Sequence, residues 1–91
     1  MSVKRVEVPE GVLVRELQGE SVLLNLDSEC YFGLDDVGTR MWSALTATGT
    51  VEAAFEALLA EYDVEPAQLR ADLSAFVDTL AGAGLVRVVA V

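Results

Sequence analysis

Side chains able to do covalent or acid–base chemistry are scarce in this 91-residue sequence. No histidine is present, which removes the commonest general base and the commonest zinc ligand. The one cysteine, Cys30, has no imidazole partner to activate it, and a lone thiol supplies too few ligands for a thiolate metal site. We interpret Cys30 as a small apolar strand residue, and we predict no enzymatic activity, no metal site and no cofactor.

Two further patterns that can mark active sites have simpler structural explanations in this chain. Asp35 and Asp36 are adjacent carboxylates at the predicted start of a helix, where capping and the helix dipole account for them. The Gly82-Ala83-Gly84 run closes a predicted helix rather than opening one after a strand, so it lacks the context of a phosphate-binding loop. The sequence therefore favours a binding protein over an enzyme.

Composition and charge argue against several classes of partner. Fifteen acidic and six basic residues give a net charge of −9, which opposes binding to nucleic acid and to anionic membranes. No apolar run approaches the ~18 residues of a membrane span, and no signal-peptide segment follows Lys4 and Arg5. We expect one small cytoplasmic domain covering residues 1–91, with its core at about residues 12–88.

The first third of the chain has the pattern of short strands. Apolar runs at Val12–Leu17, Ser21–Asp27 and Cys30–Leu34 are joined by connections of hairpin length, which predicts an antiparallel three-stranded meander. A further strand is expected at Val3–Val8, before the turn at Pro9–Gly11.

The remainder has the apolar periodicity of three amphipathic helices. Their predicted starts are Asp35 or Asp36, Thr50 and Pro66. Gly82 and Gly84 are expected to end the third helix, and Leu85–Val89 to form an extended tail. The predicted fold class is α+β, a winged helix-turn-helix-like domain with a three-stranded antiparallel sheet followed by three helices.

The third predicted strand, Cys30–Leu34, offers an open edge. It contains no Pro, no Lys and no inward charge, which are the usual protections of an edge strand. An extended peptide could add there as a further strand, held by backbone hydrogen bonds and by pockets for alternate side chains. The alternative is that the C-terminal tail or a second copy of the chain covers this edge.

The third predicted helix carries a carboxylate beside its apolar stripe. At ~100° per residue, Leu69, Leu73, Phe76 and Leu80 fall within about 60° of arc. Asp72 lies just off this cluster, where it could accept a hydrogen bond from a docked peptide. The alternative is a solvated carboxylate at the rim of the core stripe.

An ordered set of segments resembles the PqqD-like family, the recognition elements of pathways that modify ribosomally made peptides. The segments are Leu24–Leu34, Val37–Trp42, Thr50–Ala54, Leu58–Val64, and the closing stretch from Asp72–Leu73 to Leu85–Val86. The nearest resemblance is to the free-standing proteins of lasso-peptide biosynthesis. It implies a fold of three strands and three helices, and a leader peptide bound as a strand between the third strand and the third helix.

The resemblance also implies which residues contact the peptide. Strand contacts would come from Cys30, Tyr31, Phe32, Gly33 and Leu34, mostly through the backbone, with Gly33 allowing close approach. Helix contacts would come from Leu69, Asp72, Leu73 and Phe76. Some of these side chains must face the core instead, and the sequence does not distinguish them.

The predicted function is a non-catalytic adaptor. It would bind the leader of a lasso-type precursor and present it to a leader peptidase and a macrocyclase acting in trans. One alternative is a chaperone for the precursor peptide of a quinone cofactor. Others are a winged-helix DNA-binding protein, disfavoured because the third helix has only Arg70 as a cation, and a subunit that dimerises through its strand edge.

Overall fold

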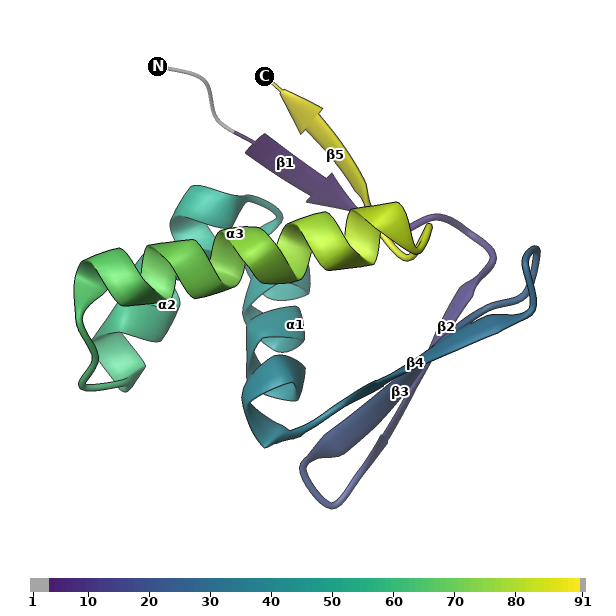
Figure 1. Ribbon diagram of the computed structural model, residues 1–91, viewed down its shortest axis with the longest axis horizontal. Helices are drawn as coiled ribbons and strands as arrows, with labels where there is room; N and C mark the ends of the chain where they lie inside the picture. Colours follow the sequence, from purple (N-terminus) through teal and green to yellow (C-terminus); the bar gives the residue numbers. More distant parts are fainter. Residues whose placement is uncertain (1–3, 91) are drawn as a thin grey trace.

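The structure is a computed structural model that describes residues 4–90 (Figure 1). In chain order its elements are β1 (Lys4–Glu7), β2 (Val12–Leu17), β3 (Glu20–Asn25), β4 (Cys30–Leu34), α1 (Asp36–Thr48), α2 (Val51–Glu61), α3 (Pro66–Gly82) and β5 (Arg87–Ala90). The predicted α+β class is confirmed, with a three-stranded antiparallel sheet of order β2-β3-β4 followed by three helices.

Local chemistry sets the two turns of this sheet. Gln18 and Gly19 both have positive φ, 54° and 83°, as a tight hairpin turn between β2 and β3 requires. The second turn, between β3 and β4, begins after Asn25, whereas the strand was predicted to continue to Asp27. The cause is Asn25, whose side-chain Oδ1 accepts hydrogen bonds from the backbone N–H groups of Asp27 at 2.9 Å and Ser28 at 3.3 Å. These bonds turn the chain away from the sheet directly after Asn25.

The two ends of the chain form a second sheet. The predicted strand at Val3–Val8 is present as β1, and its first residue, Val3, lies outside the described residues. β1 pairs antiparallel with β5, with Val6 opposite Val88. The predicted tail becomes a strand only from Arg87 onward, because Leu85 and Val86 are buried in the core.

The helix starts follow the predicted capping residues. Asp35 Oδ1 accepts a hydrogen bond from the Gly38 N–H at 2.8 Å, and Thr50 Oγ1 accepts one from the Ala53 N–H at 3.1 Å. Pro66 occupies the first turn of α3. Among the described residues, no helix is both long enough and apolar enough to cross a membrane.

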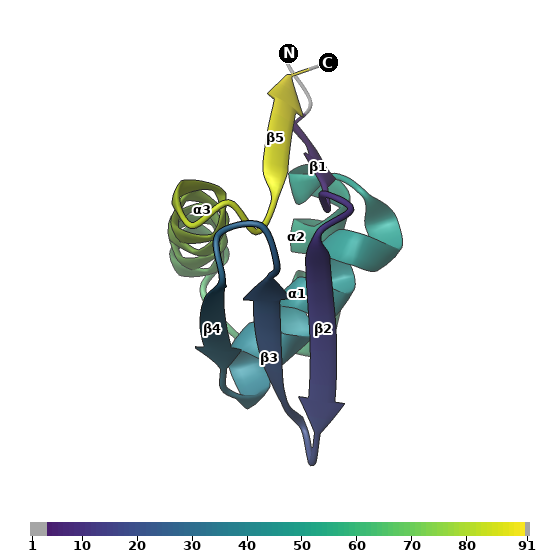
Figure 2. The same cartoon turned by 90° about the vertical axis from the view of Figure 1, so that its right-hand side faces the viewer.

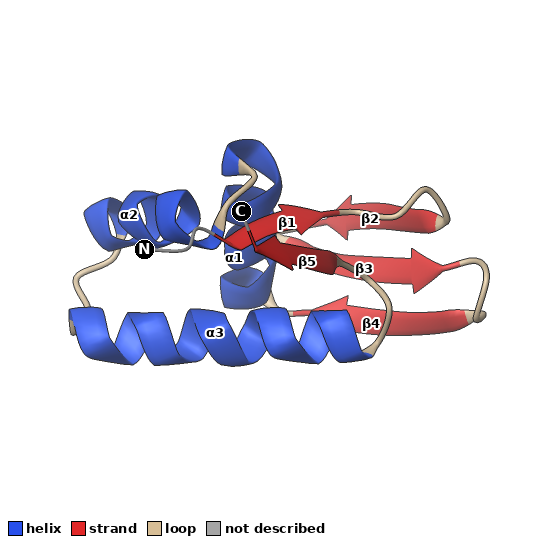
Figure 3. Ribbon diagram, turned by 90° about the horizontal axis from the view of Figure 1, so that it is seen from above, coloured by secondary structure: helices blue, strands red, loops and turns tan. Residues whose placement is uncertain are grey.

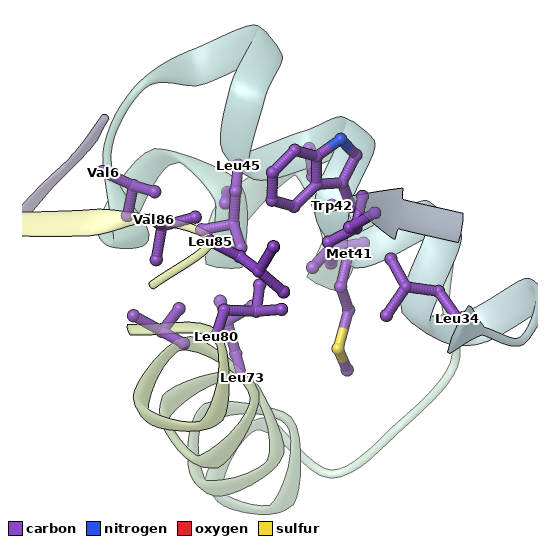
Figure 4. Packing of buried hydrophobic residues seen from close by; sticks show 14 of the residues in the cluster. Val6, Leu34, Met41, Trp42, Leu45, Leu73, Leu80, Leu85 and Val86 are labelled. Atoms are coloured by element: carbon purple, nitrogen blue, oxygen red, sulfur yellow. The ribbon is translucent and has the colours of Figure 1, made fainter. Parts of the chain in front are cut away.

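The core lies where the helices meet the inner face of the β2-β3-β4 sheet (Figures 2 and 3). Leu23 from the sheet and Leu45 from α1 are fully buried, as are Leu73 and Leu80 from α3. Leu85 follows α3 and completes the packing between that helix and α1 (Figure 4). The core therefore fixes α3 at a set distance from the sheet, with β4 as the strand nearest to it.

Candidate functional site

β4 forms one edge of its sheet. It pairs with β3 on one side, from Ser21 opposite Leu34 to Asn25 opposite Cys30. On the other side no strand pairs with it among residues 4–90, since β5 pairs with β1 instead. The tail that could have covered this edge is thus committed elsewhere, and the β4 backbone is open to a further strand.

A groove of about 570 Å³ runs between this edge and α3. Its walls come from β4, from the first turns of α1 and from one side of α3. The lining residues are Phe32, Gly33, Leu34, Asp35, Val37, Gly38, Met41, Asp72, Ala75, Phe76 and Thr79. The lining is mainly apolar, which suits an extended chain with apolar side chains.

The α3 wall is a stripe separate from the core stripe of that helix. Asp72, Ala75, Phe76 and Thr79 line the groove at i, i+3, i+4 and i+7. The buried residues of α3 are Leu69, Leu73, Val77 and Leu80. At ~100° per residue the two stripes are centred about 100° apart, with Phe76 at their border. Phe76 accordingly packs against the core and also lines the groove.

The structure separates the β4 residues that the sequence grouped together. Phe32, Gly33 and Leu34 line the groove, although Leu34 is only 6% exposed and serves mainly as core. Cys30 and Tyr31 are exposed and do not line it. Because side chains alternate along a strand, Tyr31 lies on the face opposite to Phe32. A contact from Tyr31 to an added strand would therefore be made through the backbone, whereas Cys30 lies on the same face as Phe32.

The predicted α3 residues divide in the same way. Asp72 and Phe76 line the groove, whereas Leu73 is 1% exposed and belongs to the core. Leu69 lines a smaller adjoining hollow of about 170 Å³. That hollow shares Val37, Met41 and Asp72 with the groove and extends it toward the start of α3.

Several groove residues were not predicted. Ala75 and Thr79 were missed because neither is apolar enough to mark a stripe, although both keep helical spacing with Asp72. Val37, in the first turn of α1, is exposed and lines the groove. α1 starts almost directly after β4, so its first turn lies at the end of the groove.

The polar groups that line the groove include two carboxylates, those of Asp72 and Asp35. Asp72 Oδ1 accepts a hydrogen bond from Gln68 Nε2 at 2.8 Å, and its side chain is at the exposed rim. The Asp35 carboxylate caps α1. Across the part of the chain that the structure describes, no group of His, Cys, Asp and Glu side chains is arranged to hold a metal ion. The site therefore presents an open strand edge, apolar walls and a carboxylate acceptor.

Comparisons with known proteins agree with this arrangement. The family described as coenzyme PQQ synthesis protein D (PqqD) matches residues 20–86. A solved structure of TbiB1 in complex with the TbiA(beta) leader peptide is 36% identical, with a TM-score of 0.83 over 89% of this chain and 94% of that one.

A second solved structure, lasso peptide synthetase B1 complexed with the leader peptide, is 23% identical. Its TM-score is 0.80, over 91% of this chain and 98% of that one, which supports the fold. No curated protein sequence matches.

Proposed function

The chain belongs to the PqqD family, and we propose that it is a non-catalytic adaptor that binds the leader of a ribosomally made precursor peptide. The observation that carries this proposal is the groove along the open edge of β4, in a chain 36% identical to a protein solved with a leader peptide bound. A cytoplasmic location and the absence of a resident cofactor are parts of the same proposal.

The proposed mode of binding is addition of the leader to β4 as a further strand. The β4 backbone supplies hydrogen bonds that do not depend on the leader sequence. Alternate leader side chains then point into the groove, where Phe32 and Phe76 provide apolar contacts. Asp72 at the rim accepts a hydrogen bond from the leader, which adds selectivity.

The proposed role is to raise the local concentration of the precursor at partner enzymes. The adaptor holds the leader, and a leader peptidase and a macrocyclase act in trans on the rest of the precursor. Because the precursor is tethered through its leader, the enzymes meet its reactive sites at an effective concentration that the tether sets. We favour a lasso-type precursor over the precursor of a quinone cofactor because of the likeness to TbiB1. The winged helix-turn-helix likeness stays a prediction.

DNA binding is the weaker candidate function. The net charge of −9 opposes contact with phosphates. Arg70, the cation of α3, stacks on the ring of Phe55 at 4.2 Å from its centroid, so it is already engaged within the protein. Neither observation favours a recognition helix.

The proposal is tested by filling the groove. Ala75 on α3 is exposed and lines it, so Ala75→Trp should obstruct the groove without disturbing the core. We expect the dissociation constant of a labelled synthetic lasso-precursor leader, measured by fluorescence polarisation, to rise by about tenfold or more. Leaders of a quinone-cofactor precursor and a scrambled peptide are titrated in parallel to identify the pathway.

The matched control is Ala81→Trp. Ala81 is also exposed on α3 but lies about 120° around the helix from Ala75, outside the groove lining. This variant should bind the leader like the wild type. Equal affinities for wild type and Ala75→Trp would place the peptide elsewhere, and no binding of either leader by folded wild-type protein would overturn the adaptor role.

A further inference from the structure

Basic side chains are concentrated on the two-stranded sheet of β1 and β5, which we call the terminal sheet. The whole chain has six basic residues against fifteen acidic ones. Three of the six, Lys4, Arg5 and Arg87, lie on these two strands, whose one acidic residue is Glu7. The terminal sheet is therefore locally cationic, in a chain with a net charge of −9.

The strand register places Arg5 and Arg87 on the same face of the terminal sheet. Arg5 lies opposite Val89 and Arg87 lies opposite Glu7, and directly opposed residues share a face. Val6 alternates with Arg5 and Glu7 along β1, and its side chain is buried in the core. The face that carries Arg5 and Arg87 consequently points away from the core, and we call it the cationic face.

Neither arginine of the cationic face is strongly engaged within the protein. The Arg87 side chain is 65% exposed, and its Nη1 lies 3.7 Å from Glu7 Oε1, which is a long ion pair in contact with solvent. Arg5 is exposed and forms no ion pair among residues 4–90. Because a guanidinium group pairs with a carboxylate through two parallel hydrogen bonds, both residues suit an acidic ligand.

The cationic face lies near the end of the groove at which β4 begins. Cys30 is the first residue of β4 and lies opposite Asn25, whose Nδ2 donates to the Gly84 carbonyl oxygen at 2.9 Å. Arg87 follows Gly84 by three residues, which span at most about 11 Å. With strands about 5 Å apart, a peptide added to β4 has its Cys30 end within about 30 Å of Arg87. Figure 2 shows the terminal sheet beyond this end of the three-stranded sheet.

An added strand that continues the pattern of the sheet leaves the groove at this end by its own carboxyl end. Both pairings of the three-stranded sheet are antiparallel, so a further antiparallel strand runs from Leu34 toward Cys30. Asp27 and Glu29 lie in the β3–β4 turn next to Cys30, and their carboxylates repel an acidic residue placed directly after the bound strand. Acidic residues of the peptide are therefore favoured further along, within reach of the cationic face.

We infer that the cationic face binds an acidic segment of the same precursor peptide, located up to about nine extended residues beyond the strand held on β4. The inference rests on the proposed function, to which it adds a second contact on the same peptide. A precursor segment is favoured over a separate acidic protein, because the bound leader holds it near Arg5 and Arg87 at a high effective concentration. Nucleic acid is opposed by the net charge of −9.

The test compares labelled synthetic leader peptides in fluorescence-polarisation titrations against the full chain. One leader carries a carboxyl-terminal extension of about nine Gly and Ser residues followed by four Glu, and its reference has Ser in place of the four Glu. We expect the Glu extension to tighten binding by about threefold to tenfold at low salt. The gain should largely disappear at about 0.5 M salt, because the charges are exposed to solvent. The same extension at the amino end should give no gain.

Variants of the chain locate the contact. The double variant Arg5→Gln/Arg87→Gln should bind the Glu-extended and Ser-extended leaders equally. The matched control, Arg15→Gln/Arg40→Gln, also removes two cations, of which Arg40 has an ion-pair partner in Glu61. Arg15 and Arg40 lie on β2 and α1, outside the terminal sheet and outside the groove lining, so this variant should keep the gain. Circular dichroism establishes that both variants are folded.

The inference is overturned if the Glu and Ser extensions bind with equal affinity to protein that binds the short leader. It is equally overturned if the gain survives in Arg5→Gln/Arg87→Gln, if the control variant loses it as well, or if the amino-terminal extension gains as much. Failure of the short leader to bind folded wild-type protein would contradict the proposed function, and this inference would fall with it.

Discussion

Ser21 on β3 and Thr39 on α1 join the sheet to the helix that ends the groove. Their hydroxyl oxygens are 2.7 Å apart, and the two residues are only 3% and 5% exposed. At this buried position one hydroxyl donates a hydrogen bond to the other, and removal of either leaves its partner without this bond. The pair thus fixes the position of α1 relative to β3 through two small side chains.

We expect Ser21→Ala to lower the free energy of unfolding by about 1–3 kcal/mol, because Thr39 Oγ1 is left buried and unpaired. The double variant Ser21→Ala/Thr39→Val should lose less than the sum of the two single variants, since no unpaired hydroxyl remains. Urea denaturation of the four proteins measures this coupling. Simple additivity of the two losses would show that the hydroxyl pair contributes nothing specific.

Periodicity located Asp72 relative to the apolar stripe of the third helix. The sequence placed Asp72 beside the apolar cluster of the third helix, and the structure puts it on the groove. The sequence could not separate Leu73 from Phe76, because both are large and apolar and both fall within the same arc of about 60° on the helix. The distinction depends on how far α3 is rotated against the core, which is a property of tertiary packing.

At the scale of elements, Asn25 connects the sheet to the end of α3. Its Nδ2 donates to the carbonyl oxygen of Gly84 at 2.9 Å, while its Oδ1 accepts from the turn after β3. Gly84 has φ of 75° and lies two residues after the end of α3 at Gly82. One side chain therefore holds the β3–β4 turn against the helix whose other side forms the groove wall.

Replacement of this amide by a carboxylate tests that connection. Asn25→Asp keeps the acceptor but loses the donor, and it faces a carboxylate toward the Gly84 carbonyl. We expect a loss of about 1–2 kcal/mol in the free energy of unfolding. Leader affinity should also weaken by several-fold, because α3 is less firmly positioned.

Ser28→Ala is the control in the same turn, since the hydrogen bonds that involve Ser28 use only its backbone N–H and carbonyl groups. This variant should match the wild type in thermal denaturation and peptide titration. Wild-type behaviour of Asn25→Asp in both assays would contradict the role given to Asn25.

The helix starts could be predicted from the sequence, because residues next to each start indicate it. Asp35, Thr50 and Pro66 indicated the helix starts because capping and proline preferences act within a few residues. The pairing of β1 with β5 was not predicted, since it joins opposite ends of the chain and no local pattern encodes it. Because β5 pairs with β1, it does not pair with β4, and the edge of β4 stays open.

At the scale of the whole molecule, one core connects the chain ends, the sheet and the helices. Buried residues extend from Val6 near the start of the chain to Val86 near its end. The groove beside α3 lies outside this core. The groove follows from physical reasoning about an open edge, whereas the identity of its peptide came from the resemblance and the comparisons, because an apolar groove accepts many extended sequences.

The most direct test of the central claim is residue-resolved amide hydrogen exchange by NMR, with and without saturating leader peptide. If the leader adds to the sheet, edge-facing amides of β4, Cys30–Leu34, should exchange more slowly in the complex because they donate to the added strand. The amides of β2 at the opposite edge should be unaffected. Unchanged exchange along β4 at saturation, or protection along β2 instead, would contradict strand addition at this site.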